Sequence, residues 1–81
     1  MALKATIISL KDGYTHLEDL RSITIVSKGY NIMIMEDYVP LIGEVDGSVL
    51  FTAKNGEKTE FSSVHGYYRH CRNEFSFMME V

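Results

Sequence analysis

The sequence predicts an all-β domain, and three observations carry that prediction. Turn-forming residue pairs divide the 81 residues into pieces of roughly 8 to 16 residues, a spacing typical of short strands. Apolar and polar residues alternate within these pieces, as in residues 22–25 and 74–80. No stretch repeats apolar residues with helical spacing over three turns. Many short antiparallel strands favour a sandwich or a barrel, because both dispose of open sheet edges.

Five turn-forming pairs mark the predicted strand ends, namely Asp12-Gly13, Lys28-Gly29, Asp46-Gly47, Asn55-Gly56 and Arg72-Asn73. Asn55-Gly56 is the strongest signal, because both residues tolerate the positive φ that a two-residue hairpin turn requires. Arg72-Asn73 is predicted to form a second tight turn. Pro40, the only proline, is predicted either to end a strand or to position a loop.

Alternation also predicts which side chains form the core, namely Ile23, Ile25, Val49, Phe51, Phe61, Phe75 and Phe77. At Ile7-Ile8 and at residues 32–35, consecutive residues are apolar, so both faces of the predicted strand are apolar. These two strands are therefore predicted to be covered on both sides or to form an interface. Gly66 is predicted to allow close packing of the sheet or to form a bulge. The methionines fit a partner-binding face and the core equally well: Met33, Met35, Met78 and Met79.

Composition excludes several classes of protein. A net charge of −3 argues against a general nucleic-acid binder, which needs a basic surface. One cysteine cannot form an intramolecular disulfide, so a reducing compartment is expected. No apolar run approaches the roughly 20 residues of a membrane-spanning helix, and the first residues show no targeting pattern. We therefore expect a soluble intracellular domain, or one docked to a membrane machine through protein contacts.

Candidate catalytic and metal-binding residues are few. His70 and Cys71 are neighbours in a predicted strand and so face opposite ways, which predicts a buried thiol beside an exposed imidazole. These two residues together with His16 and His65 match no closed zinc spacing. The sequence therefore predicts no catalytic, cofactor-binding or metal-binding residues, which favours an adaptor or structural subunit over an enzyme.

Other reactive side chains have a simpler explanation. The adjacent acids Glu36-Asp37 and Glu18-Asp19 are expected to be solvated. Tyr67-Tyr68 lacks the basic surroundings of a base-stacking platform, so packing is the favoured explanation. No glycine-rich phosphate-binding motif is present.

A longer pattern extends over nearly the whole chain. Ile23-Thr24-Ile25-Val26 is followed by a loop through Gly29, then Ile32-Met33-Ile34 and Val39-Pro40-Leu41-Ile42. The pattern continues with residues 46–51, 55–61, 64–68 and 75–80. In order and spacing, these motifs resemble the epsilon subunit of bacterial F-type ATP synthases. The chain departs from the family pattern at Tyr30-Asn31, Tyr38 and Tyr67.

The resemblance implies an epsilon-subunit-like domain over residues 1–81, a flattened antiparallel β-sandwich of about ten short strands. The chain stops at Val81, before the family's C-terminal helical hairpin. The implied function is that of a non-catalytic central-rotor subunit, which links the gamma stalk to the c-ring in proton- or sodium-driven ATP synthesis. Its partners would be the gamma subunit and the c-ring. It would lie in the cytoplasm at the inner face of the cell membrane, associated with the membrane only through the complex.

Within that resemblance, the loops facing the c-ring would contain Lys28, Gly29, Tyr30, Asn31, Glu36, Asp37, Tyr38 and Pro40. Glu36 and Asp37 would supply negative charge opposite basic loops of the ring. Two alternatives remain open at this point. One is a repurposed epsilon-like or free-standing small β domain that binds a protein, a peptide or a small ligand. The other is a small metal or thiol enzyme that uses His65, His70 and Cys71.

Overall fold

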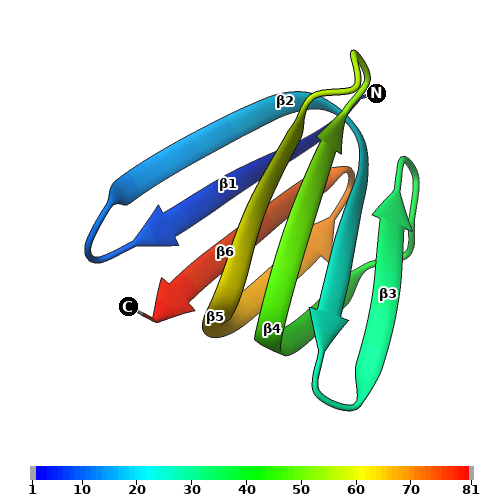
Figure 1. Ribbon diagram of the computed structural model, residues 1–81. Helices are drawn as coiled ribbons and strands as arrows, with labels where there is room; N and C mark the ends of the chain where they lie inside the picture. Colours follow the sequence, from blue (N-terminus) through cyan, green and yellow to red (C-terminus); the bar gives the residue numbers. More distant parts are fainter. Residues whose placement is uncertain (1, 81) are drawn as a thin grey trace.

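The computed structural model describes residues 2–80, which form strands and turns without a helix (Figure 1). The strands are β1 (Leu3–Ser9), β2 (Gly13–Ser27), β3 (Tyr30–Met35), β4 (Leu41–Ala53), β5 (Lys58–Cys71) and β6 (Glu74–Glu80). The all-β prediction is confirmed. The described residues include no helix with the length and apolar character needed to cross a membrane.

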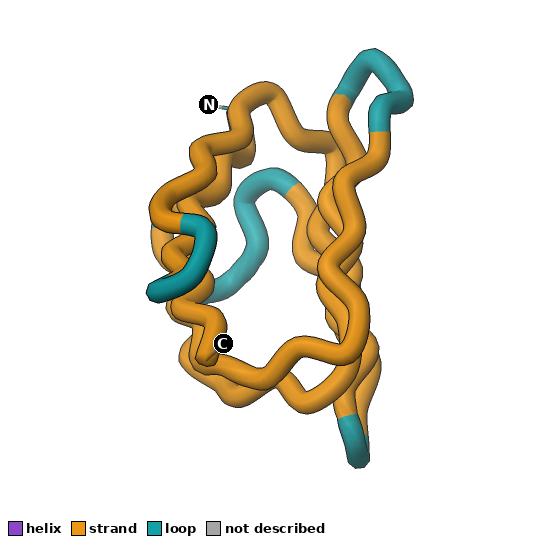
Figure 2. The backbone as a smooth tube through the Cα atoms, turned by 60° about the vertical axis from the view of Figure 1, so that its left-hand side comes forward, coloured by secondary structure: helices purple, strands orange, loops and turns teal. Residues whose placement is uncertain are grey.

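Five of the strands close into a barrel, in the order β1-β6-β5-β4-β2, and β2 pairs back onto β1. The β1–β6 pair is parallel, and the other pairs are antiparallel. The sixth strand, β3, pairs with β2 and extends the sheet outside the barrel. In Figure 2 the walls of the barrel stand apart and are joined through bends in the long strands.

The expectation of about ten short strands is wrong, because the described chain has six strands and three of them are long. Strands β2, β4 and β5 have 15, 13 and 14 residues. Each one bends, and the segments before and after the bend belong to different walls of the barrel. For example, β2 pairs with β1 through residues 13–20 and with β4 through residues 20–27.

Two of the bends occur at bulges, where a residue adopts a left-handed backbone. Asp19 in β2 has a φ of 53°, and Ser63 in β5 has a φ of 54°. At each site the pairing register shifts against the neighbouring strand. A bulge adds one residue to one strand and increases the local twist, which is how a long strand turns a barrel corner.

Three of the five predicted turns have different outcomes in the structure. Arg72-Asn73 is confirmed as a two-residue turn, with φ values of 52° and 62°. The hairpin at Asn55-Gly56 exists, but only Gly56 has a positive φ, and the Gly56 amide donates to the Ala53 carbonyl. That hairpin therefore has a longer loop than predicted. The pair Asp46-Gly47 is not a turn, because both residues lie inside β4.

The core follows the predicted alternation closely. Six of the seven predicted core residues are buried, and the seventh, Phe61, is partly buried and packs against the core. The ring of Phe51 meets Phe61 and Phe75 edge to face, at centroid distances of 6.0 and 5.9 Å. Phe75 in turn stacks on Tyr68 at 5.4 Å. This aromatic cluster joins β4, β5 and β6 inside the barrel.

One end of the barrel is fastened by Asn73, a buried residue in the β5–β6 turn. Its side-chain oxygen accepts from the Asp37 amide at 2.6 Å, and its side-chain nitrogen donates to the Asp37 carboxylate at 3.1 Å. Its backbone carbonyl accepts from the Lys4 amide at 3.0 Å. Asn73 thereby ties the loop after β3 and the start of β1 to the last hairpin.

Candidate docking surface

The residues predicted to face a c-ring do not lie together. Lys28 and Gly29 form the turn between β2 and β3, whereas Glu36, Asp37 and Tyr38 follow the far end of β3. The six residues of β3 separate these groups by roughly 17–20 Å along an extended strand. Figure 1 shows the two segments at opposite ends of β3. They therefore cannot form one continuous edge.

Several of these predicted residues are held by contacts within the chain. The Tyr30 hydroxyl donates to the Glu44 carbonyl at 2.5 Å and lies 3.4 Å from the Tyr68 hydroxyl. Burial and the neighbouring Tyr30 hydroxyl raise the pKa of Tyr68. Asn31 and Pro40 are exposed. Asp37 is fixed by Asn73, as described above, so its carboxylate has a structural role in this loop.

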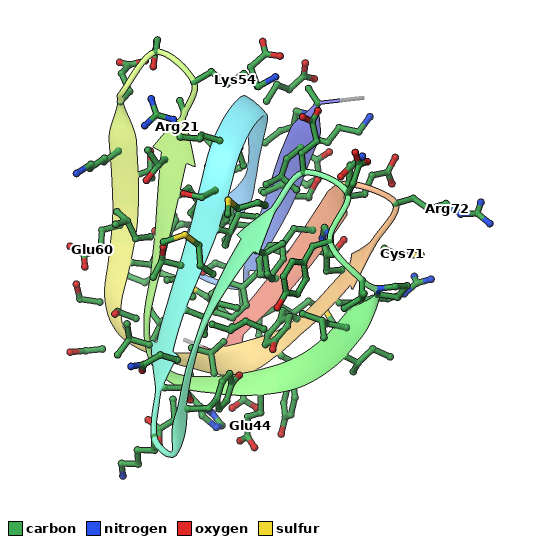
Figure 3. All side chains as sticks on the ribbon, turned by 90° about the vertical axis from the view of Figure 1, so that its right-hand side faces the viewer. Arg21, Glu44, Lys54, Glu60, Cys71 and Arg72 are labelled. Carbon is green, nitrogen blue, oxygen red and sulfur yellow. The ribbon has the colours of Figure 1, made fainter. Side chains whose placement is uncertain are left out.

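The predicted His70–Cys71 arrangement is reversed. His70 is 1% exposed, and Cys71 is partly exposed as a free thiol. The reason is the phase of β5, which directs Gly66, Tyr68 and His70 inward and their neighbours outward. Figure 3 shows Cys71 and Arg72 beside one another at the end of this strand, well away from Glu44. Within residues 2–80, no group of three or more His, Cys, Asp or Glu side chains is placed to hold a metal ion.

A row of large side chains crosses four neighbouring strands on the outside of the barrel. Tyr14 of β2 pairs with Ile8 of β1, Ile8 with Met78 of β6, and Met78 with Tyr67 of β5. Their exposed fractions are 70%, 41%, 57% and 51% in that order. At about 4.8 Å between strands, the row extends for about 14 Å. We call these four residues the apolar row.

The apolar row also borders a shallow hollow in the surface. Leu10, in the loop after β1, is 92% exposed and lines this hollow together with Ile8, Tyr67 and Met78. A contiguous apolar area of this kind on a small domain marks an interaction site more often than a random surface does. The residues that precede Ile8 and Met78 in their strands, Ile7 and Phe77, face the opposite way and are buried in the core.

An acidic cluster flanks the row at its β5 end. Glu44 of β4 pairs with Tyr67 in register, and His65 lies two residues before Tyr67 on β5. Nε2 of His65 lies 2.6 Å from the Glu44 carboxylate, and Nδ1 contacts the Glu80 carboxylate. Ionised carboxylates only accept hydrogen bonds, so both ring nitrogens must donate. The two hydrogen bonds therefore favour the charged imidazolium and raise the pKa of His65.

We expect the stability of the wild-type protein to depend on pH through His65. Because the folded pKa is raised, the stabilising contribution is complete below the unfolded pKa of about 6.5 and is lost as pH rises through the folded pKa. In urea unfolding at a series of pH values, His65→Gln should lower the midpoint most near pH 6 and progressively less as pH rises to about 9. The variants Glu44→Gln and Glu80→Gln should each shrink the difference. An equal loss at both pH values would contradict this assignment.

Comparison with models of known protein families and with curated protein sequences gave no match to this chain. The sequence indicated two residues of the apolar row. Ile8 follows the apolar Ile7, so both faces of that strand are apolar, and Met78 was predicted to lie either in a partner-binding face or in the core. It gave no reason to join these residues to Tyr14 or Tyr67. Their adjacency depends on the parallel pairing of β1 with β6, which are about 70 positions apart in the chain.

Proposed function

We propose that this chain is a non-catalytic protein-binding module that docks onto a partner protein through the apolar row. The supporting observation is the register of Tyr14, Ile8, Met78 and Tyr67, which places four exposed large side chains side by side on one face. None of the four residues belongs to the buried core cluster or to the partly buried side chains packed against it. Covering it removes apolar surface from water, which is the main driving force of protein association.

The chemistry of the row favours a protein over a small ligand. Tyrosine and methionine are enriched at protein interfaces, where tyrosine supplies a large contact area with few rotatable bonds. The row lies on the outer face of a sheet and is bordered by a shallow hollow, and small-molecule sites are typically enclosed. Glu44 and Glu80 supply a polar rim that can select the partner's orientation.

A rotor subunit of an F-type ATP synthase is the narrower form of this proposal, and it rests on the sequence resemblance. In that form the apolar row would face the gamma stalk, and the domain would be the family's β-sandwich. A barrel of five strands with a sixth strand outside it, together with the separation of the predicted loop residues, gives less support to the narrower form than to the general one. A small β domain that binds a protein partner is therefore the function we favour.

The test uses a lysine placed in the row. Met78→Lys should weaken capture of the partner by about tenfold or more, because a charge would have to be buried in the interface. Ser62→Lys adds the same charge on an exposed part of β5 outside the row and should leave capture unchanged. Both lysine variants should unfold at the wild-type temperature. Equal capture by Met78→Lys and wild type would contradict the proposal, and absence of gamma subunit from the captured complex would contradict only the narrower form.

A further inference from the structure

Strand β3 has an unpaired edge with an unusual composition. It pairs with β2 on one side and ends the sheet on the other. Other strands also extend past their partners, but these overhangs carry charges, such as Glu18 in β2, Glu44 in β4 and Glu60 in β5. Charged residues on an edge discourage pairing with another chain. The sequence of β3, YNIMIM, contains neither a charge nor a proline.

The backbone groups on this edge follow from the pairing. The Lys28 amide donates to the Asp46 carbonyl on β4, so alternate residues of β2 face β4 and the intervening ones face β3. Ser27 pairs with Tyr30 across the two-residue turn. The odd-numbered residues of β3 therefore direct their N–H and C=O groups outward. The Met35 carbonyl already accepts from the Tyr38 amide, which leaves both groups of Asn31 and of Met33 for a partner strand.

The side chains on this edge are also accessible. Met33 and Met35 are each 50% exposed, and Asn31 is exposed. The alternate residues Ile32 and Ile34 face the core. Figure 1 shows β3 at the margin of the molecule, and in Figure 3 it crosses the face nearest the viewer.

We propose that two copies of this chain pair through β3, antiparallel and about a twofold axis. With Asn31 opposite Met33 of the second copy, the N–H and C=O groups of both residues form about four inter-copy hydrogen bonds. This register places Lys28 of each copy opposite Glu36 of the other. The Lys28 ammonium lies 3.6 Å from the Asp46 carboxylate of its own chain, but its side chain is 86% exposed and can also reach Glu36 of the second copy. The antiparallel arrangement therefore brings Lys28 to the acidic residues after β3, whereas a parallel one would place the two Lys28 residues together.

The twofold arrangement also ends at two copies. Each β3 has one open edge, and antiparallel pairing uses it in both partners, so the interface is closed. The apolar row lies on β1, β2, β5 and β6 and takes no part in it. The dimer consequently presents two apolar rows, and a partner protein would bind to each one independently of the β3 contact.

Sedimentation equilibrium from about 1 μM to 1 mM tests the dimer, since this range covers weak and moderate affinities. The wild type should dimerise, and Met33→Pro, which removes an outward N–H, should weaken the dimer by about tenfold or more. Lys28→Glu should weaken it in a salt-dependent manner, and Lys28→Glu with Glu36→Lys should restore it. Lys11→Glu makes the same charge change in the β1–β2 loop and should have no effect.

Three results would overturn the proposal. The first is a wild type that remains monomeric throughout that concentration range. The second is a folded Met33→Pro variant that dimerises as tightly as the wild type. The third is a double charge reversal that fails to restore the dimer lost in Lys28→Glu. If Met33→Pro does not fold, the charge-reversal series decides alone, because it leaves the backbone unchanged. Met78→Lys should dimerise normally, which separates this proposal from the docking function of the apolar row.

Discussion

Replacing Gly66 by alanine should lower the free energy of unfolding by about 3 kcal/mol or more, the upper range for overpacking a well-packed site. A Cβ at this position would lie 2.1 Å from the Met78 carbonyl oxygen and 3.0 Å from the Met79 Cα atom. Both atoms belong to the backbone of β6, so no rotamer change relieves the clash. Either β5 and β6 separate at this point or the barrel opens.

The same reasoning applies to Gly47, where a Cβ would lie 2.0 Å from the Val26 carbonyl oxygen. Gly66 and Gly47 occupy neighbouring strands close to the Ser63 bulge. They mark a corner of the barrel at which the strands approach more closely than side chains allow.

Urea unfolding of Gly66→Ala beside Gly29→Ala measures this effect. Gly29 has a φ of 89° and open space around its Cα atom, so alanine there incurs only the left-handed backbone cost of about 1–2 kcal/mol. We expect Gly66→Ala to be clearly the less stable variant. A Gly66→Ala protein within about 1 kcal/mol of the wild type would show that the close approach does not exist.

Replacing His70 by leucine should stabilise the protein by about 1–2 kcal/mol at neutral or alkaline pH, because burying an unsatisfied polar group costs about that much. His70 is 1% exposed, and neither ring nitrogen has a hydrogen-bond partner among residues 2–80. Its ring lies 6.4 Å from that of Phe75, within the aromatic cluster. Leucine fills a similar volume without polar atoms.

The gain should increase in acid. Burial lowers the pKa of His70 in the folded protein, so below the unfolded pKa of about 6.5 the unfolded chain binds a proton that the folded chain does not. The stability of the wild type therefore falls as pH decreases through this range. The stability of His70→Leu should not show the part of this decrease that comes from protonation of His70 in the unfolded chain. The change in stability with pH that His70 causes is thus opposite in direction to the change expected from His65.

A glutamine at position 70 separates the two effects. His70→Gln removes the titrating group but keeps a buried polar side chain, so it should flatten the acid dependence without the stability gain. Unfolding curves at about pH 5 and pH 8 lie on either side of the histidine titration and are sufficient. If His70→Leu were less stable than the wild type at both pH values, a hydrogen-bond partner of the imidazole would be implied.

Local sequence pattern predicted the interior of this protein well. Alternation identified Ile23, Val49 and Phe77 as core because period-two burial depends only on the strand being half buried. The tight turn at Arg72-Asn73 was also predictable, because whether residues tolerate the positive φ of such a turn depends on local sequence and not on distant parts of the chain.

Closure of the barrel was not predictable from local pattern. Asp19 and Ser63 adopt positive φ inside strands, although neither residue type specifies a bulge. Asp46-Gly47 has the composition of a turn, but it lies in β4 because its glycine permits the approach to Val26. Such bends look like strand ends in the sequence, so local pattern divides the chain into pieces shorter than the strands it forms. The number of about ten short strands itself came from the family resemblance, which the six strands of the structure do not match.

The docking surface was only partly predictable for a related reason. Exposed Ile8 and Met78 were visible as apolar residues out of phase with the core. Their neighbours in space are set by the register of β1 with β2 and β6. Register over long sequence separations comes from tertiary packing, so single residues were identifiable while the row they form was not.

Site-specific photo-cross-linking in the native cells tests the central claim most directly. A photoreactive phenylalanine derivative would replace Tyr67 or Tyr14 in the apolar row and, as a control, Ser62 outside it. We predict that both row positions cross-link to one and the same protein, that Met78→Lys abolishes this product, and that the Ser62 position does not form it. Formation of the same product from Ser62, or no product from either row position, would contradict docking through the apolar row.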